Sequence, residues 1–200
     1  MSKVVATFVF TLSLISAGLD SGAQTFELSK EKSTVFITGT STLHNWRMDL
    51  KMFNCLADFV LTGNRLKTIE NAAFECRATD LKSESSLMNK KAYSAMKSEV
   101  FPDIKYKMTE LAVNPSDNTN FSENTKGLLT VAGKTNNISF PVSAAMSGLG
   151  GKTTISVKGE TELDMSDFGI IPPVLMLGTL RTGNRIKVAF SLLFISKSDN

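Results

Sequence analysis

Two neighbouring segments with alternating apolar residues, between Met52 and Thr79, constrain the fold of this chain more than any other feature. Apolar residues at every second position are typical of a strand that buries one face. We place the hairpin loop at residues 64–67, which predicts that Cys55 lies opposite Cys76; a slip of one residue would turn the whole apolar face to water. The alternating residues are Phe53, Cys55, Ala57, Phe59 and Leu61, followed by Ala72, Phe74, Cys76 and Ala78.

A single hairpin with one apolar face is not stable in water, so the rest of the chain must cover it. Alternating segments recur at 33–40, after Trp46, and at 104–113, 126–133, 136–146, 153–163 and 185–196. A change of phase near Glu110 predicts a β-bulge. About eight antiparallel strands separated by turn residues predict an all-β fold, arranged as a barrel or a sandwich.

One segment breaks the alternation and predicts the only helix. Residues 87–97 fit about three helical turns, with Ser85 or Ser86 as the N-cap. The helix must end before the Phe101-Pro102 pair, because a residue before proline is disfavoured in the α conformation. We expect this helix to cross one end of the barrel. Residues 164–184, rich in glycine, form the longest irregular segment and predict a functional loop or a lid.

The N-terminus resembles a targeting segment rather than part of the fold. Lys3 precedes an uncharged apolar run at 4–17, and the small residues Ser21 and Ala23 follow it. This layout predicts a signal peptide at 1–23, because the run is shorter than the ~20 residues of a membrane-spanning helix. A permanent N-terminal anchor is the alternative. We therefore expect a periplasmic or secreted protein, with one domain at 24–200 and no membrane span in the mature chain.

The composition is that of an ordinary globular protein, with 42% hydrophobic and 20% charged residues and a net charge of +3 in 200 residues. Because lysines and arginines are scattered along the chain, we do not expect it to bind nucleic acid. The Gly150-Gly151-Lys152-Thr153 stretch lacks the earlier glycine of a phosphate-binding loop and precedes a strand, so it predicts no nucleotide site. We expect no cofactor.

The two cysteines allow two interpretations. Outside the cytoplasm, Cys55 and Cys76 on paired strands can form a disulfide. Alternatively, both are buried free thiols that pack as small hydrophobic residues. We expect no metal site, because His44 is the only histidine and no cysteine has the spacing of a zinc ligand.

The order of these features resembles the YceI-like family of exported bacterial proteins, over about residues 26–196. The resemblance rests on GTSTLHNW at 39–46, LKS at 81–83, VFPDI at 100–104, GLLTVAGKT at 127–135 and MSDFGI at 165–170. It implies an extended, eight-stranded, lipocalin-like antiparallel β-barrel with one helix between strands. It also implies an elongated apolar tunnel that holds a polyisoprenoid or a similar long amphiphile.

We therefore expect a non-catalytic protein that sequesters or carries a long-chain lipophile of the polyisoprenoid or fatty-acyl type. Small residues such as Ala57 and Gly159 among the aromatic ones are consistent with a cavity and equally with ordinary packing. The side chains expected to face the ligand are Phe53, Phe59, Phe74, Phe140, Ile155, Val188, Phe190 and Phe194.

Four polar or amphipathic residues are further candidates for ligand contact. His44 and Trp46 lie near a loop, where the alternatives are a hydrogen-bonded structural histidine and a core or barrel-end tryptophan. Arg181 and Arg185 can meet an anionic head group, or remain solvated at a strand end. Two other functions stay open: a lipid-modifying enzyme with His44 as its base, and a filled barrel that binds partner proteins. A homodimer also stays open as a partner arrangement.

Overall fold

The computed structural model describes residues 25–63, 65–111, 120–149, 151–175 and 179–197. Within these ranges the chain forms twelve strands, one α-helix and three short 3₁₀ turns. Eight of the described strands have eight or more residues. The strands are β1 (Phe26–Leu28), β2 (Thr34–Ser41), β3 (Trp46–Leu50), β4 (Asn54–Thr62), β5 (Arg65–Arg77), β6 (Leu81–Lys82), β7 (Asp103–Leu111), β8 (Asn120–Val131), β9 (Lys134–Leu149), β10 (Lys152–Asp164), β11 (Val174–Leu175) and β12 (Leu180–Ser196), and the helix is α1 (Ser86–Ala95).

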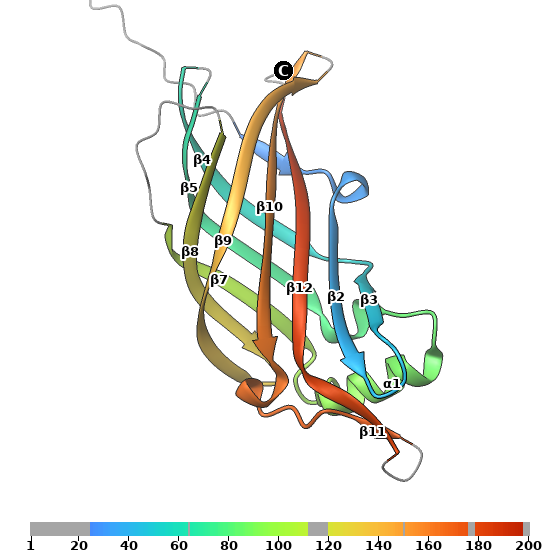
Figure 1. The fold of residues 1–200 in the computed structure, drawn as a ribbon. Helices are drawn as coiled ribbons and strands as arrows, with labels where there is room; N and C mark the ends of the chain where they lie inside the picture. Colours follow the sequence, from blue (N-terminus) through green and yellow to red (C-terminus); the bar gives the residue numbers. More distant parts are fainter. Residues whose placement is uncertain (1–24, 64, 112–119, 150, 176–178, 198–200) are drawn as a thin grey trace, which may run out of the picture.

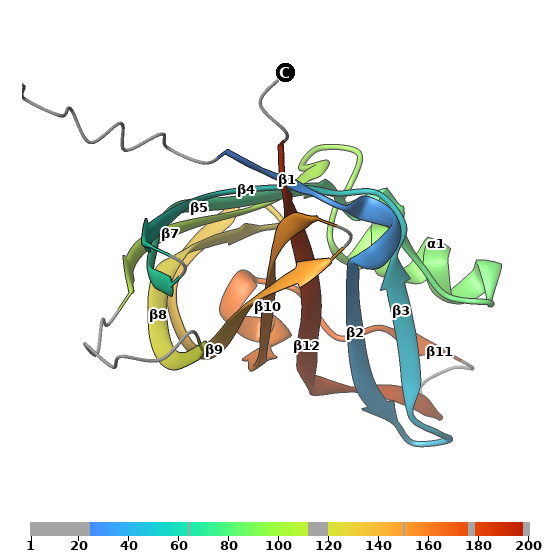
Figure 2. The same ribbon diagram turned by 90° about the horizontal axis from the view of Figure 1, so that it is seen from above.

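All the described strands belong to one antiparallel arrangement that curls around a concave face (Figure 1). The order is β4-β5-β7-β8-β9-β10-β12-β2-β3-β6, and β1 and β11 each pair with β12. Seen from above, the strands follow an arc (Figure 2). The predicted fold class is therefore confirmed, but the sheet forms a half-barrel with more strands than the eight expected.

The β4–β5 hairpin exists, but its predicted register is wrong. Cys55 pairs with Phe74, and Cys76 pairs with Ile104 on β7. Two register shifts lie in the hairpin, and the pair Thr62 and Arg65 shows that β5 already begins inside the predicted loop 64–67. Gly63, with φ of 56°, permits this tighter turn. An alternating pattern fixes which face is apolar, but it does not reveal bulges, and each bulge moves the register by one residue.

One bulge of the hairpin has an identifiable local support. Asn71 adopts φ of 48°, a left-handed conformation that asparagine tolerates better than most residues. Its side-chain amide donates a hydrogen bond of 2.9 Å to the Asp58 carboxylate on β4. The bulge predicted near Glu110 is confirmed, since the register of β7 with β8 shifts between Met108 and Glu110.

Helix α1 covers the lower end of the curled sheet in Figure 1. Ser85 is its N-cap, and the Ser85 hydroxyl accepts a hydrogen bond of 3.3 Å from the Met88 amide. The helix ends at Ala95, two residues earlier than predicted, and Lys97 then turns the chain with φ of 53°. The Tyr93 hydroxyl lies 2.7 Å from the Leu81 carbonyl oxygen, which ties α1 to β6.

The predicted irregular segment 164–184 is shorter in the structure. Residues Met165–Phe168 form a 3₁₀ turn that ends at Gly169, whose φ is 68°. Its buried side chains Met165, Phe168 and the following Ile170 join the core. β12 begins at Leu180, five residues before the predicted strand start, so the segment contributes to the sheet as well as to the end of the barrel.

Candidate ligand cavity

The concave face of the sheet encloses a cavity of about 530 Å³. All eight long strands contribute apolar side chains to it, and α1 closes part of its lower end. The volume lies within the ~300–1,000 Å³ typical of small-molecule sites. Representative lining residues are Val35, Ile37, Met48, Ala57, Ile69, Ala72, Ile104, Leu129, Ile138, Val142, Val157, Leu163 and Leu192.

Five of the eight predicted wall residues line this cavity, and three do not. Those that line it are Phe74, Phe140, Val188, Phe190 and Phe194. Phe53 is buried outside the lining, with its ring centroid 5.7 Å from that of Phe74. Ile155 is fully buried in the core, and Phe59 packs among other rings.

Aromatic side chains pack where β1 crosses towards β4. The Phe59 ring lies at 5.2 Å from the Phe26 ring and at 4.9 Å from the Phe194 ring, in edge-to-face geometry. Phe26 belongs to β1, which pairs with β12, so these contacts connect β12 with the edge strand β4. Phe59 therefore joins two parts of the sheet and does not form cavity wall.

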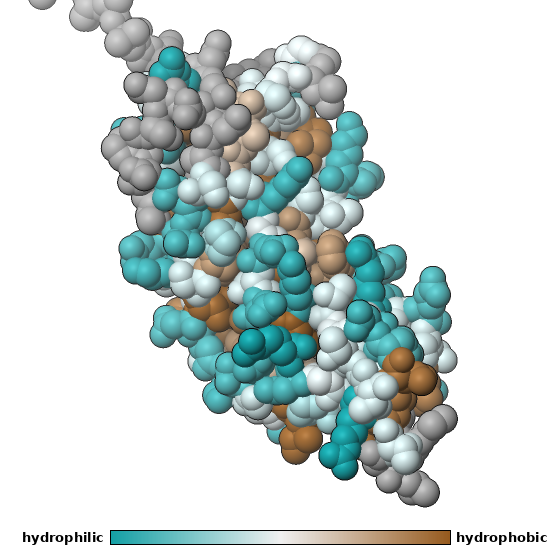
Figure 3. All heavy atoms as spheres, viewed as in Figure 1, coloured by the Kyte–Doolittle hydropathy of each residue, from teal (hydrophilic) through white to brown (hydrophobic). Residues whose placement is uncertain are grey.

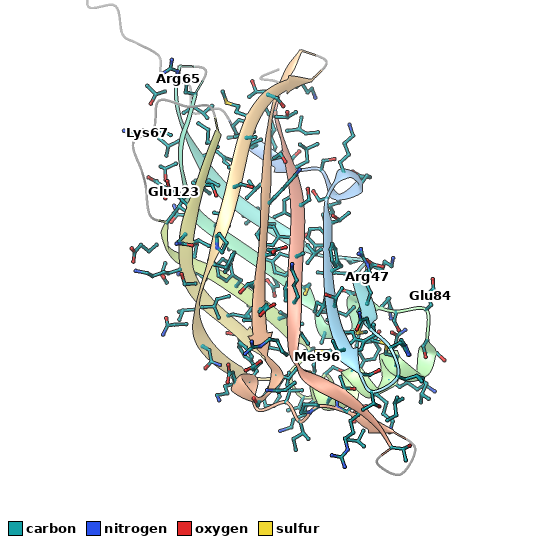
Figure 4. All side chains as sticks on the ribbon, in the orientation of Figure 1. Arg47, Arg65, Lys67, Glu84, Met96 and Glu123 are labelled. Atoms are coloured by element: carbon teal, nitrogen blue, oxygen red, sulfur yellow. The ribbon has the colours of Figure 1, made fainter. Side chains whose placement is uncertain are left out.

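The mouth of the cavity can be located from the lining residues that are exposed to solvent. Four lining residues are exposed: His44, Ser85, Leu87 and Lys91. They come from the β2–β3 turn and from the beginning of α1, so the cavity opens between these two elements. Figure 4 shows Arg47 and Glu84 pointing outward near this end, while Met96, a buried lining residue, lies beneath the sheet.

The helix supplies lining residues that the sequence analysis did not propose. Leu87, Met88, Lys91, Ala92 and Ala95 all line the cavity. Their spacing places them on one face of a helix, which is the signal that could have identified them. The exposed Lys91 belongs to this face and lies at the mouth of the cavity.

Trp46 lines the cavity because a glycine makes room for it. Gly39 on β2 pairs directly with Trp46 on β3, and a Cβ at position 39 would collide with the indole ring. The indole N–H donates a hydrogen bond of 3.0 Å to the Thr40 carbonyl. The only tryptophan of the chain is therefore a fixed part of the wall, close to the mouth.

His44 reaches the cavity through a tight turn. The Ser41 hydroxyl donates a 2.7 Å hydrogen bond to the His44 carbonyl, and the His44 amide donates to the same hydroxyl. The imidazole is exposed and makes no hydrogen bond or ion pair with the residues that the structure describes. A histidine base is normally oriented by a third group, and no described residue supplies one here.

The small residues of the walls have two different roles. A Cβ at Gly159 would meet the ring of Phe190 on the paired strand β12, so this position is filled by an aromatic neighbour. Ala57 and Ala72, in contrast, leave space and line the cavity. Both interpretations of the sequence pattern, interdigitated packing and a cavity, therefore apply, at different positions.

The one hydroxyl pair in the wall satisfies itself. The Tyr106 hydroxyl lies 3.1 Å from the Thr125 hydroxyl, which in turn donates to the Glu110 carbonyl at 3.2 Å. Burial raises the pKa of Tyr106 above its usual value, and the bond to Thr125 lowers it by less. This pair costs little to keep within an apolar wall because both hydroxyl protons have acceptors.

Cys55 and Cys76 both line the cavity as free thiols. They lie on neighbouring strands, but the observed register pairs each of them with another residue, so the second interpretation of the cysteines agrees with the structure. The pKa of both thiols is raised to about 12, by burial for Cys55 and by burial together with the nearby charges of Asp80, Glu75 and Asp103 for Cys76. Such thiols are protonated at neutral pH.

Neither predicted arginine lines the cavity. The Arg185 guanidinium lies on the exposed surface, 3.0 Å from the Asp164 carboxylate and 3.7 Å from that of Glu162. The hydrogen bond and charge of Asp164 raise the pKa of Arg185. The Arg181 backbone amide donates to the Thr42 hydroxyl, which fixes the β2–β3 turn to β12. Arg185 thus fits the solvated interpretation.

The described residues contain neither a metal-binding cluster nor a helix that could span a membrane. No group of three or more histidine, cysteine or carboxylate side chains is placed to hold a metal ion there. Among the same residues, no helix has the length and apolarity needed to cross a membrane. The predicted signal peptide at 1–23 lies outside the part of the chain that is described.

An elongated antiparallel half-barrel with an apolar cavity on its concave face and a helix across one end defines a lipocalin-like class of cavity proteins. Residues 26–194 match the YceI-like domain, so the chain belongs to the YceI-like family. The resemblance seen in the sequence is therefore confirmed.

Solved structures share this fold at low sequence identity. BcnA of Burkholderia cenocepacia has a TM-score of 0.64 at 14% identity, covering 84% of this chain and 99% of its own. The YceI protein of Campylobacter jejuni has 0.61 at 14%, covering 76% and 85%. A polyisoprenoid binding domain of Saccharophagus degradans, implicated in plant cell wall breakdown, has 0.62 at 10%, covering 87% and 99%. No curated protein matches the chain.

Proposed function

We propose that this protein binds a long-chain lipophile, of the polyisoprenoid or fatty-acyl type, and sequesters or carries it in the periplasm or outside the cell. The apolar cavity of about 530 Å³ is the observation that carries this proposal. Burial of a hydrocarbon chain against such walls contributes about 25 cal/mol per Å², before the cost of ordering the chain. A fully filled barrel would offer no such volume.

The lining and the family support the proposed class of ligand. Apart from a few hydroxyl groups, among them the Tyr106 and Thr125 pair, the walls are apolar, which favours a hydrocarbon chain over a polar solute. The fold is shared with the polyisoprenoid binding domain of Saccharophagus degradans, which supports an isoprenoid chain. We place the polar end of the ligand at the mouth, beside His44, Ser85 and Lys91.

We propose a binding role without catalysis. The exposed His44 imidazole has no orienting partner among the described residues, and both cavity thiols are protonated at neutral pH because their pKa is about 12. A His44→Ala variant should therefore retain the same unmodified ligand as the wild type. Turnover of a bound lipid that this substitution abolishes would contradict the non-catalytic role.

Native mass spectrometry of detergent-free protein, beside a denatured control, tests the binding itself. We expect a discrete excess mass that denaturation releases as a lipid, or uptake of an added polyprenyl or fatty-acyl probe. Because Trp46 is the only tryptophan and lines the cavity, its fluorescence should change when the probe binds. A protein that shows only the mass of the bare chain and takes up neither probe would refute the proposal.

Cavity-filling variants connect the binding to this site. Ala72→Phe on β5 and Ala92→Phe on α1 each place a ring where the cavity now is, and should weaken probe binding about tenfold or more. Ser94→Phe is the matched control, because Ser94 is exposed on the same helix and does not line the cavity. Equal loss in all three variants would mean that the effect is not steric filling.

A further inference from the structure

The mouth of the cavity is surrounded by large apolar side chains that are exposed to solvent. Four such residues flank it: Leu43 at 73%, Leu87 at 54%, Ile171 at 82% and Val174 at 49% exposure. We call these four residues the apolar rim. Exposed apolar side chains that gather at one place mark an interaction surface, whereas single scattered ones do not.

The apolar rim is continuous with the cavity. Leu43 precedes the lining residue His44, Leu87 itself lines the cavity, and Ile171 and Val174 flank a segment that includes the lining residue Pro173. The Thr42 amide donates a hydrogen bond of 3.0 Å to the Arg181 carbonyl, so the β2–β3 turn and the start of β12 are held together. Figure 3 shows hydrophobic surface at the lower end of the molecule, where Figure 1 places α1 and β11.

The three segments that carry the apolar rim contain positive but no negative side chains. Residues 41–46, 86–95 and 169–184 contain no aspartate or glutamate. Among their exposed cationic side chains are Lys90 and Lys91. Neither lysine forms an ion pair with a described residue, whereas Lys105, Lys126 and Lys187 on the barrel wall do. Glu84 and Asp167 lie just outside these segments. The rim therefore combines apolar tips with unneutralised positive charge.

We propose that the apolar rim, with Lys90 and Lys91, seats the mouth of the cavity on the surface of an anionic lipid bilayer. Apolar side chains can enter the headgroup region while lysines are attracted to anionic lipids. A lipophile could then pass between bilayer and cavity without crossing water. The purpose of this contact rests on the proposed function, but the contact itself can be tested separately.

The test is flotation of the full chain with vesicles of phosphatidylglycerol and phosphatidylcholine in equal amounts, beside vesicles of phosphatidylcholine alone. We expect binding to the anionic vesicles that weakens at high salt. The Leu43→Ser and Ile171→Ser double variant should lose most of this binding, and Lys90→Gln should weaken it about fivefold, since one lysine near such a surface contributes about 1 kcal/mol. None of these three residues lines the cavity.

Matched controls lie elsewhere on the barrel. Leu56 on β4 is as exposed as Leu43, at 73%, and Lys158 on β10 is exposed and without an ion pair to the described residues, so Leu56→Ser and Lys158→Gln should leave vesicle binding unchanged. Equal loss in the controls, or a wild type that binds no vesicles, would overturn the inference. The inference would also be overturned if the apolar rim holds two copies of the chain together. The wild type would then be a dimer in solution, and the rim variants would be monomers.

A probe-binding measurement in the absence of vesicles separates this inference from the proposed function. The rim variants should still bind the polyprenyl or fatty-acyl probe like the wild type. If the wild type binds the probe but no vesicles, docking is refuted and the proposed function stands. If vesicles are bound and the probe is not, the cavity proposal fails while the docking surface remains.

Discussion

Cys55 and Cys76 show how burial changes the chemistry of single residues. Each thiol has an ordinary pKa of 9.0 that burial raises to about 12 in the folded chain. Between these values the unfolded chain has lost the thiol proton and the folded chain has kept it. Thiol burial therefore stabilises the fold fully below pH 9.0, and this contribution falls as the pH rises towards about 12.

We predict that each thiol contributes a decline of about 1.4 kcal/mol per pH unit in the free energy of unfolding across that window. Urea unfolding at a series of alkaline pH values measures the decline. A Cys55→Ala and Cys76→Ala double variant should be less stable at neutral pH, but its stability should fall less steeply. Parallel declines in the two proteins would show that the thiols are not buried as described.

At the level of elements, the N-cap of α1 is part of a small hydrogen-bonded cluster that fixes the first turn of the helix. The Ser85 hydroxyl accepts the Met88 amide, and Ser83 and Asn89 form further hydrogen bonds around the same turn. The first turn also carries the mouth residue Leu87. A cap therefore positions part of the cavity as well as the helix.

We predict that Ser85→Ala destabilises the first turn by about 1 kcal/mol, which corresponds to about fivefold faster amide exchange at Met88 if exchange proceeds through local opening. Hydrogen exchange resolved by residue measures it. Ser94→Ala is the control, because Ser94 lies exposed on the same helix and its side chain forms no hydrogen bond with the described residues. Unchanged exchange in Ser85→Ala would contradict the capping role.

At the scale of the whole molecule, ring packing connects the two sides of a sheet that does not close by hydrogen bonds alone. Phe59 on β4 contacts Phe26 on β1 and Phe194 on β12. β1 pairs with β12 but forms no strand pairing with β4. The aromatic contacts therefore connect β1 and β4 where backbone hydrogen bonds between the two strands are missing. The half-barrel is therefore held at this place by side chains.

We predict that Phe59→Ala lowers the free energy of unfolding by about 3–5 kcal/mol, as expected for removal of a packed aromatic ring. Phe36→Ala is the matched control. Its ring lies on the outer face beneath the Arg47 guanidinium, 3.7 Å from its centroid, and its loss should cost only about 1 kcal/mol. Urea unfolding measures both. Similar decreases in the free energy of unfolding for the two variants would mean that Phe59 does not hold the two parts of the sheet together.

From the sequence we could predict the fold class, the helix with Ser85 among its candidate caps, the bulge near Glu110 and the family. Each depends on a local or repeating pattern: period-2 alternation, a capping serine or motifs in order. The alternation also identified five of the eight proposed wall residues, because inward and outward faces follow from parity alone.

The register, the cavity and its mouth became known only from the folded chain. The pairing of Cys55 with Phe74 depends on two bulges that alternation does not reveal. Whether a small residue leaves space depends on its neighbour across the sheet. The Phe190 ring occupies the space beside Gly159, whereas the space beside Ala72 belongs to the cavity. The mouth joins a turn near residue 44 with a helix near residue 91. Such contacts between distant segments are set by how the sheet curls, which no local pattern encodes.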